Sequence, residues 1–75
     1  MGTMAFYLNV PLLEHGIADT TGPLEKVELR HFATKLIYGD AAFLQGIAQE
    51  RWPDCIWKIE HVRTRKYVVR GTPKG

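Results

Sequence analysis

The strongest constraint on the fold of this chain is a pair of alternating apolar segments near its end. In CIWKIEHV, the side chains of Cys55, Trp57 and Ile59 fall on one side of an extended chain, which is the period of a β-strand. KYVV resumes the alternation after the polar interruption RTR. We therefore predict a β-hairpin that turns near Arg63 and Thr64, with one long bent strand as the alternative.

The first part of the chain, MAFYLNVPLL, also alternates. Its apolar side chains on one side are Phe6, Leu8, Val10 and Leu12. This pattern predicts a strand with one buried face. Pro11 cannot donate a hydrogen bond to a ladder, so it marks an edge or the end of regular pairing. The next segment, HGIADTTG, has the composition of a loop.

Between these strands the apolar spacing becomes helical. Gly22 and Pro23 suit a helix start, Gly39 suits a helix end, and Pro53 ends the second helical segment. LEKVELRHFATKLIYG and AAFLQGIAQERW are therefore predicted to form two helices, or one long helix kinked at Gly39-Asp40. The predicted apolar faces consist of Leu29, Phe32, Ala33 and Leu36 in the first segment, and Phe43, Leu44, Ile47 and Ala48 in the second.

These elements predict an α+β fold in β-α-α-β-β order. We expect a small antiparallel sheet with two helices, or one kinked helix, packed on one face. Seventy-five residues with 45% hydrophobic and 24% charged side chains form one globular domain, residues 1–75. Residues 1–3 are interpreted as a vector remnant and residues 71–75 as a flexible tail. One or both of Trp52 and Trp57 are expected to fill the core between helix and sheet; an exposed Trp would instead indicate an anchor for a protein partner.

A single cysteine and the absence of an export signal indicate a cytoplasmic protein. Cys55 cannot form an internal disulfide bond, and beside Trp57 it is expected to act as a small buried hydrophobe. No apolar run approaches the ~18 residues of a membrane span, and no signal peptide is recognisable. We therefore expect no membrane association.

The charges are distributed unevenly. Residues 1–54 carry four Lys and Arg against seven Asp and Glu, whereas residues 55–75 carry six against one. This asymmetry points to an anionic partner of the second hairpin. The alternative is that Lys and Arg on an edge strand only discourage aggregation. The residues predicted to contact a partner or phosphate are Lys58, Arg63, Arg65, Lys66, Tyr67 and Arg70.

Other chemistry is poorly supported by the sequence. Cys55 and His61 have no CxxC or HxxxH pair to reinforce a zinc site. Asp54 and Cys55 are adjacent and would face opposite sides of a strand, so they do not form a catalytic triad with His61. We expect no catalytic residue, no cofactor and no metal, and hence no enzyme.

A helix-turn-helix is a further alternative for the two predicted helices, with Gly39 in the turn. The second helix offers few side chains for reading base edges, namely Gln45, Gln49 and Arg51. Its surroundings are acidic, whereas a DNA reader needs cations that hold the phosphates. The helix-turn-helix interpretation is therefore disfavoured.

Two functions are consistent with the sequence. The first is a small protein-interaction module, an inhibitor or adaptor of the kind found among phage and mobile-element products. It would dock on a larger protein through its sheet edge, helix face or basic hairpin. The alternative is a nucleic-acid-binding protein that contacts phosphates through the basic C-terminal hairpin. Homo-oligomers could also form if the hairpin paired with the acidic side chains Glu25, Glu28, Asp40 and Glu50 of another copy.

Overall fold

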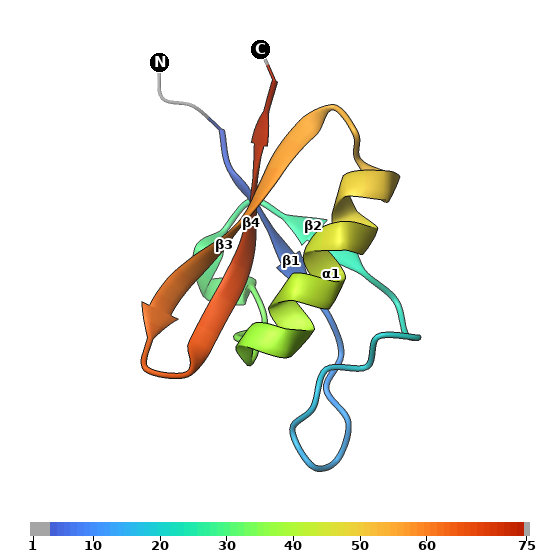
Figure 1. Cartoon of the computed structure of the whole chain (residues 1–75), viewed down its shortest axis with the longest axis vertical. Coiled ribbons are helices and arrows are strands. Elements are labelled where there is room, and N and C mark those ends of the chain that lie inside the picture. Colours follow the sequence, from blue (N-terminus) through green and yellow to red (C-terminus); the bar gives the residue numbers. More distant parts are fainter. Residues whose placement is uncertain (1–3, 75) are drawn as a thin grey trace.

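The computed structural model describes residues 4–74 and contains one α-helix and a four-stranded antiparallel sheet (Figure 1). The sheet order is β2-β1-β4-β3. The predicted α+β class with a small antiparallel sheet is confirmed; the vector remnant predicted at residues 1–3 lies outside the described residues. The elements are β1 (Phe6–Asn9), β2 (Glu25–Val27), the 3-10 helix η1 (Arg30–Phe32), α1 (Tyr38–Arg51), β3 (Cys55–Arg63) and β4 (Lys66–Pro73).

The first predicted helix is wrong, and so is the β-α-α-β-β order. Its residues form β2, η1 and an extended link, so the order is β-β-α-β-β with η1 before α1. β2 pairs antiparallel with β1, with Lys26 opposite Leu8. This long-range pairing satisfies the backbone groups that a helix would have satisfied locally. The predicted stripe therefore breaks up: Leu29 and Phe32 are exposed, whereas Ala33 and Leu36 are buried in two different clusters.

The second predicted helix is confirmed as α1, which starts earlier than expected. It begins at Tyr38, so Gly39 lies in its first turn and does not end a preceding helix. Asp40, also in the first turn, accepts a hydrogen bond from the backbone N–H of Ala18 at 3.3 Å. The buried face consists of Ala41, Leu44 and Ala48. Phe43, predicted to be buried, is 58% exposed.

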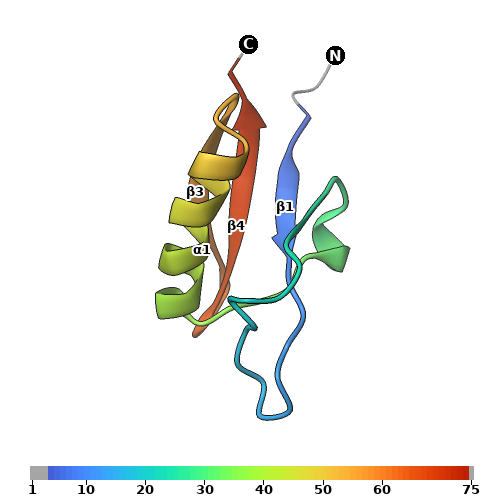
Figure 2. The ribbon, with the colours of Figure 1, turned by 90° about the vertical axis from the view of Figure 1, so that its right-hand side faces the viewer.

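Chain segments pack on both faces of the sheet and not on one, although the second face is covered only in part. Figure 2 shows α1 on one side of the strands and the segment with η1, in green, on the other. On the α1 side, Leu8, Leu44 and Trp57 belong to the larger core cluster, which Trp52 and Cys55 complete as predicted. The smaller cluster on the opposite face consists of Tyr7, Ala33 and Val68.

The predicted hairpin is confirmed, with its turn at Thr64 and Arg65. Arg65 adopts a φ of 60°, a left-handed conformation that is uncommon outside glycine. A register shift lies between His61 and Arg63. The flexible tail predicted from residue 71 is wrong for Gly71–Pro73, because β4 stays paired with β3 as far as the Cys55–Pro73 pair. Gly75 lies outside the described residues.

Candidate protein interface

The solvent-facing side of α1 has an unusual composition. Residues 41–49, AAFLQGIAQ, contain no charged side chain. A surface helix normally places charged residues opposite its buried face. Between Gly39 and Gly46, α1 instead exposes four small or apolar residues, which we call the outer face of α1: Gly39, Ala42, Phe43 and Gly46. Beyond this face, Glu50 and Arg51 in the last turn of α1 are also exposed.

The two glycines of this outer face are not required by the fold. A Cβ added to Gly39 or Gly46 would meet no atom within 4 Å. Glycine inside a helix costs about 0.5–1 kcal/mol relative to alanine. Gly46 therefore lowers helix stability and improves no internal packing. Its effect is to leave the helix backbone open to close approach beside the exposed ring of Phe43.

Three aromatic rings connect α1 to the β3–β4 hairpin. Tyr38, the first residue of α1, meets Tyr67 edge to face, with ring centroids 5.3 Å apart. Tyr67 in turn lies against His61, its cross-strand partner, with centroids 5.0 Å apart. Tyr38 is 59% exposed although it makes this contact. We call Tyr38, His61 and Tyr67 the aromatic cluster. Its member Tyr38 lies one helical turn before Ala42 of the outer face.

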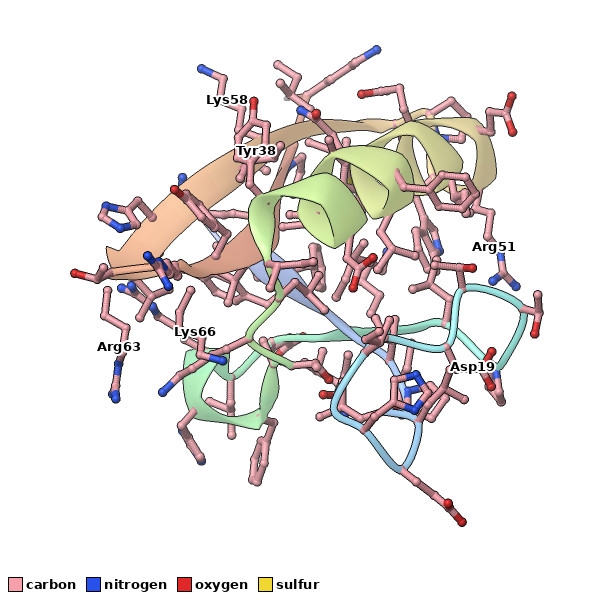
Figure 3. The ribbon with its side chains drawn as sticks, turned by 60° about the horizontal axis from the view of Figure 1, so that its bottom comes forward. Asp19, Tyr38, Arg51, Lys58, Arg63 and Lys66 are labelled. Atoms are coloured by element: carbon pink, nitrogen blue, oxygen red, sulfur yellow. The ribbon has the colours of Figure 1, made fainter. Side chains whose placement is uncertain are left out.

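The end of the hairpin carries three cations. Arg63, Arg65 and Lys66 are exposed, and none of them forms an ion pair within residues 4–74. Arg63 and Lys66 are also directly opposite in register, which is unfavourable for like charges. Figure 3 shows both side chains at the hairpin end, on the opposite side of the view from Asp19 and Arg51. We call residues 63–66 the hairpin tip.

Two further predicted contact residues lie elsewhere. Lys58 and Arg70 are cross-strand partners on the sheet face opposite α1, and they line a hollow of about 210 Å³ with Ile56 and Thr72. Arg70 Nε also lies 4.0 Å from a carboxylate oxygen of Glu60. The six predicted residues therefore divide into three groups: three at the hairpin tip, Tyr67 in the aromatic cluster, and Lys58 with Arg70 in the hollow.

The sequence interpretation missed Phe43 and Tyr38. The signal that could have indicated them is the run from Ala41 to Gln49, which contains no charged residue. A helix with only one buried face normally carries charged residues on its exposed face within such a length. The helix-turn-helix alternative is wrong, because α1 is the only α-helix among residues 4–74. Cys55 is buried in the core. Within the same residues, no three His, Cys, Asp or Glu side chains are grouped to hold a metal ion.

Comparisons of this chain with protein families, with curated proteins and with solved structures return no match. None of the helices in residues 4–74 has the length and apolar character needed to span a membrane.

Proposed function

We propose that this chain is a protein-interaction module, an inhibitor or adaptor, that docks on an acidic surface of a larger protein. Its docking surface comprises the outer face of α1, the aromatic cluster and the hairpin tip. The observation that carries the proposal is the outer face of α1, where Phe43 is 58% exposed on a helix without charged residues between Ala41 and Gln49. Charged residues normally occupy the exposed face of a surface helix, so an exposed stretch without them is typical of a surface that a partner covers.

The chemistry of the surrounding residues matches a protein interface. Aromatic residues and arginine are enriched in the residues that dominate binding energy, and charged residues are depleted from the centre of such interfaces. Here Phe43 and Tyr38 are large exposed apolar side chains of α1, and Arg63 and Arg65 are exposed at the hairpin tip. Cations at the margin accelerate association with a partner of opposite charge. The partner is therefore a protein that presents Asp or Glu beside an apolar patch.

The test is affinity capture from a lysate of the source cells, with identification of the retained proteins by mass spectrometry. The key variant is Phe43→Glu, which places a charge at the centre of the outer face. Leu12→Glu is the matched control, because Leu12 is similarly exposed at 52% but lies in the loop between β1 and β2. We expect Leu12→Glu to retain the proteins that the wild type retains, and Phe43→Glu to lose them.

Circular dichroism of both variants provides the fold control, since neither side chain is buried. Equal retention of every protein by Phe43→Glu would contradict docking through α1. Loss of the same proteins by Leu12→Glu would show that the selectivity does not come from this face.

Nucleic-acid binding is the second candidate, favoured by the position of the aromatic cluster beside the hairpin tip. Aromatic rings next to cations can stack on unpaired bases while the cations contact phosphates. Fluorescence anisotropy with labelled single-stranded DNA, duplex DNA and RNA at about 50 and 200 mM salt distinguishes the two candidates. Saturable binding that weakens with salt and is lost in Tyr38→Ala would favour nucleic acid. Flat binding curves at low salt would exclude nucleic-acid binding and leave docking on a protein as the remaining candidate.

A further inference from the structure

β3, which is nine residues long, forms one edge of the sheet. The strand order places β3 at one edge and the three-residue strand β2 at the other. An edge strand presents backbone N–H and C=O groups that can pair with another extended chain. Whether the β3 edge is available depends on which residues point outward and on what already covers them.

The hydrogen bonds of Tyr67 identify the outward-pointing residues of β3. Tyr67 and Leu36 exchange two backbone hydrogen bonds, both 2.7 Å, on the side of β4 away from β3. Tyr67 therefore does not bond to its β3 partner His61, and in antiparallel pairs this arrangement recurs at every second residue. As a result, Trp57, Ile59 and His61 direct their backbone groups toward the open edge.

Helix α1 covers only the first half of this edge. The side-chain amides of Gln49 and Gln45, one helical turn apart, donate to the carbonyl oxygens of Cys55 at 3.1 Å and Trp57 at 2.7 Å. Further toward the start of α1 the same spacing reaches Ala41, and neither Ala41 nor its neighbour Ala42 has a side-chain donor. No side chain of residues 4–74 donates a hydrogen bond to the carbonyl oxygens of Ile59 and His61.

We propose that the uncovered half of the β3 edge, residues 58–62, accepts an extended acidic segment of the protein partner as a fifth strand. This inference rests on the proposed function and specifies the form that one part of the partner takes. The backbone N–H and C=O groups of Ile59 and His61 supply two donors and two acceptors. Such strand addition provides affinity through main-chain hydrogen bonds and specificity through the flanking side chains.

The charges beside this edge select a segment that carries carboxylates. Glu60 already has two cationic partners, because its carboxylate lies 2.9 Å from Arg30 and 4.0 Å from Arg70. Lys58, at one end of the uncovered half, and Arg63, the residue just beyond its other end, form no ion pair within residues 4–74. Lys58 also faces Arg70 in register across the hollow, an unfavourable pair that a carboxylate between them would stabilise.

The experiment uses isotope-labelled protein and an eight-residue peptide of alternating Glu and Thr. Two further peptides are controls: the same sequence with N-methyl groups on every second amide, and its Lys–Thr counterpart. At a concentration about ten times its Kd, the Glu–Thr peptide should slow amide exchange of Ile59 and His61 about tenfold. The Lys–Thr and N-methylated peptides should leave both exchange rates unchanged, since one lacks the charge and the other the donors.

Ile59→Pro provides an independent variant. Its N–H points away from β4, so proline removes an edge donor without removing a β3–β4 hydrogen bond. Binding of the Glu–Thr peptide should be lost in Ile59→Pro and retained in Ile59→Ala. If Ile59→Pro does not fold, the comparison of the N-methylated and unmethylated peptides still decides the question.

Three results would overturn strand addition. The first is equal binding of the N-methylated peptide, with shifts confined to the hairpin tip. The second is slowed exchange at Ile59 and His61 on raising the protein concentration alone, which would assign the edge to a second copy of the chain. The third is no response to the Glu–Thr peptide at all. Each leaves the Phe43→Glu capture experiment unaffected, so failure of this inference is distinguishable from failure of the proposed function.

Discussion

Trp57 covers Gly71 across the β3–β4 hairpin, and its indole ring occupies the space where a side chain of residue 71 would lie. The two residues are directly opposite in register. A Cβ built on Gly71 would lie within 2.7 Å of three ring carbons of Trp57. The indole N–H donates to the backbone carbonyl of Trp52 at 3.2 Å, which fixes the ring orientation. The absence of a side chain at Gly71 is therefore what allows Trp57 to pack flat in the core.

Gly71→Ala should lower the free energy of unfolding by about 1–3 kcal/mol, because the added methyl group must displace a buried ring. Urea denaturation of the variant and the wild type measures the difference. Wild-type stability in Gly71→Ala would mean that the indole can move aside at little cost, contrary to its fixed position here.

Gly46→Ala should have the opposite effect on stability. A Cβ at Gly46 meets no atom within 4 Å, so alanine should raise the free energy of unfolding by about 0.5–1 kcal/mol. If a partner packs against the outer face of α1, the same methyl group should weaken that complex. The measurement is urea denaturation together with titration of the captured partner. A variant that is more stable and binds as well as the wild type would exclude close packing at Gly46.

Sequence periodicity predicted correctly those strands that pair with a near neighbour in the chain. The β3–β4 hairpin has short-range partners, and the alternation of Trp57 and Ile59 located it correctly. β2 could not be located, because only pairing with β1, some twenty residues earlier, stabilises Glu25–Val27 against the helix that the spacing of Leu29 and Phe32 suggests. Helical spacing in a short segment is weak evidence when tertiary pairing competes with it.

The candidate site was predictable in part for a related reason. Charge is visible in sequence, so the cations of the hairpin tip were identified. The sequence did not predict that Lys58 and Arg70 lie apart from Arg63, because their positions depend on the register of β3 against β4. The exposure of Phe43 also required the position of α1 on the sheet, since an amphipathic pattern without charges does not specify which side is buried.

Thr34 links the end of β1 to the segment before α1. Its hydroxyl oxygen accepts a hydrogen bond from the N–H of Val10 at 3.0 Å, and the hydroxyl lies 2.7 Å from the carbonyl of Val10. Thr34→Val keeps the shape of the side chain but leaves the N–H of the buried Val10 without its acceptor. The expected loss is about 1–3 kcal/mol. Thermal unfolding should show a Tm lowered by several degrees. Thr72→Val is the matched control, because the side chain of Thr72 makes no hydrogen bond within residues 4–74.

Replacing the three cations of the hairpin tip together should affect association more than folding. Arg63 and Lys66 face each other with like charge, so Arg63→Ala, Arg65→Ala and Lys66→Ala remove a repulsion and no ion pair. The free energy of unfolding should therefore change by no more than about 0.5 kcal/mol. Association with an acidic partner should slow, and its rate should depend less on salt, because long-range attraction is screened over about 8–10 Å at 0.10–0.15 M.

Stopped-flow or surface-based kinetics at low and high salt measure this effect with the partner retained by the wild type. The control replaces Arg51 and Lys74, two cations outside the hairpin tip, with alanine. That variant should keep most of the salt dependence, since the lost charge lies away from the docking surface. An unchanged salt slope in the triple variant would remove the hairpin tip from the interface, and the uncharged face of α1 with Phe43 would then have to account for binding alone.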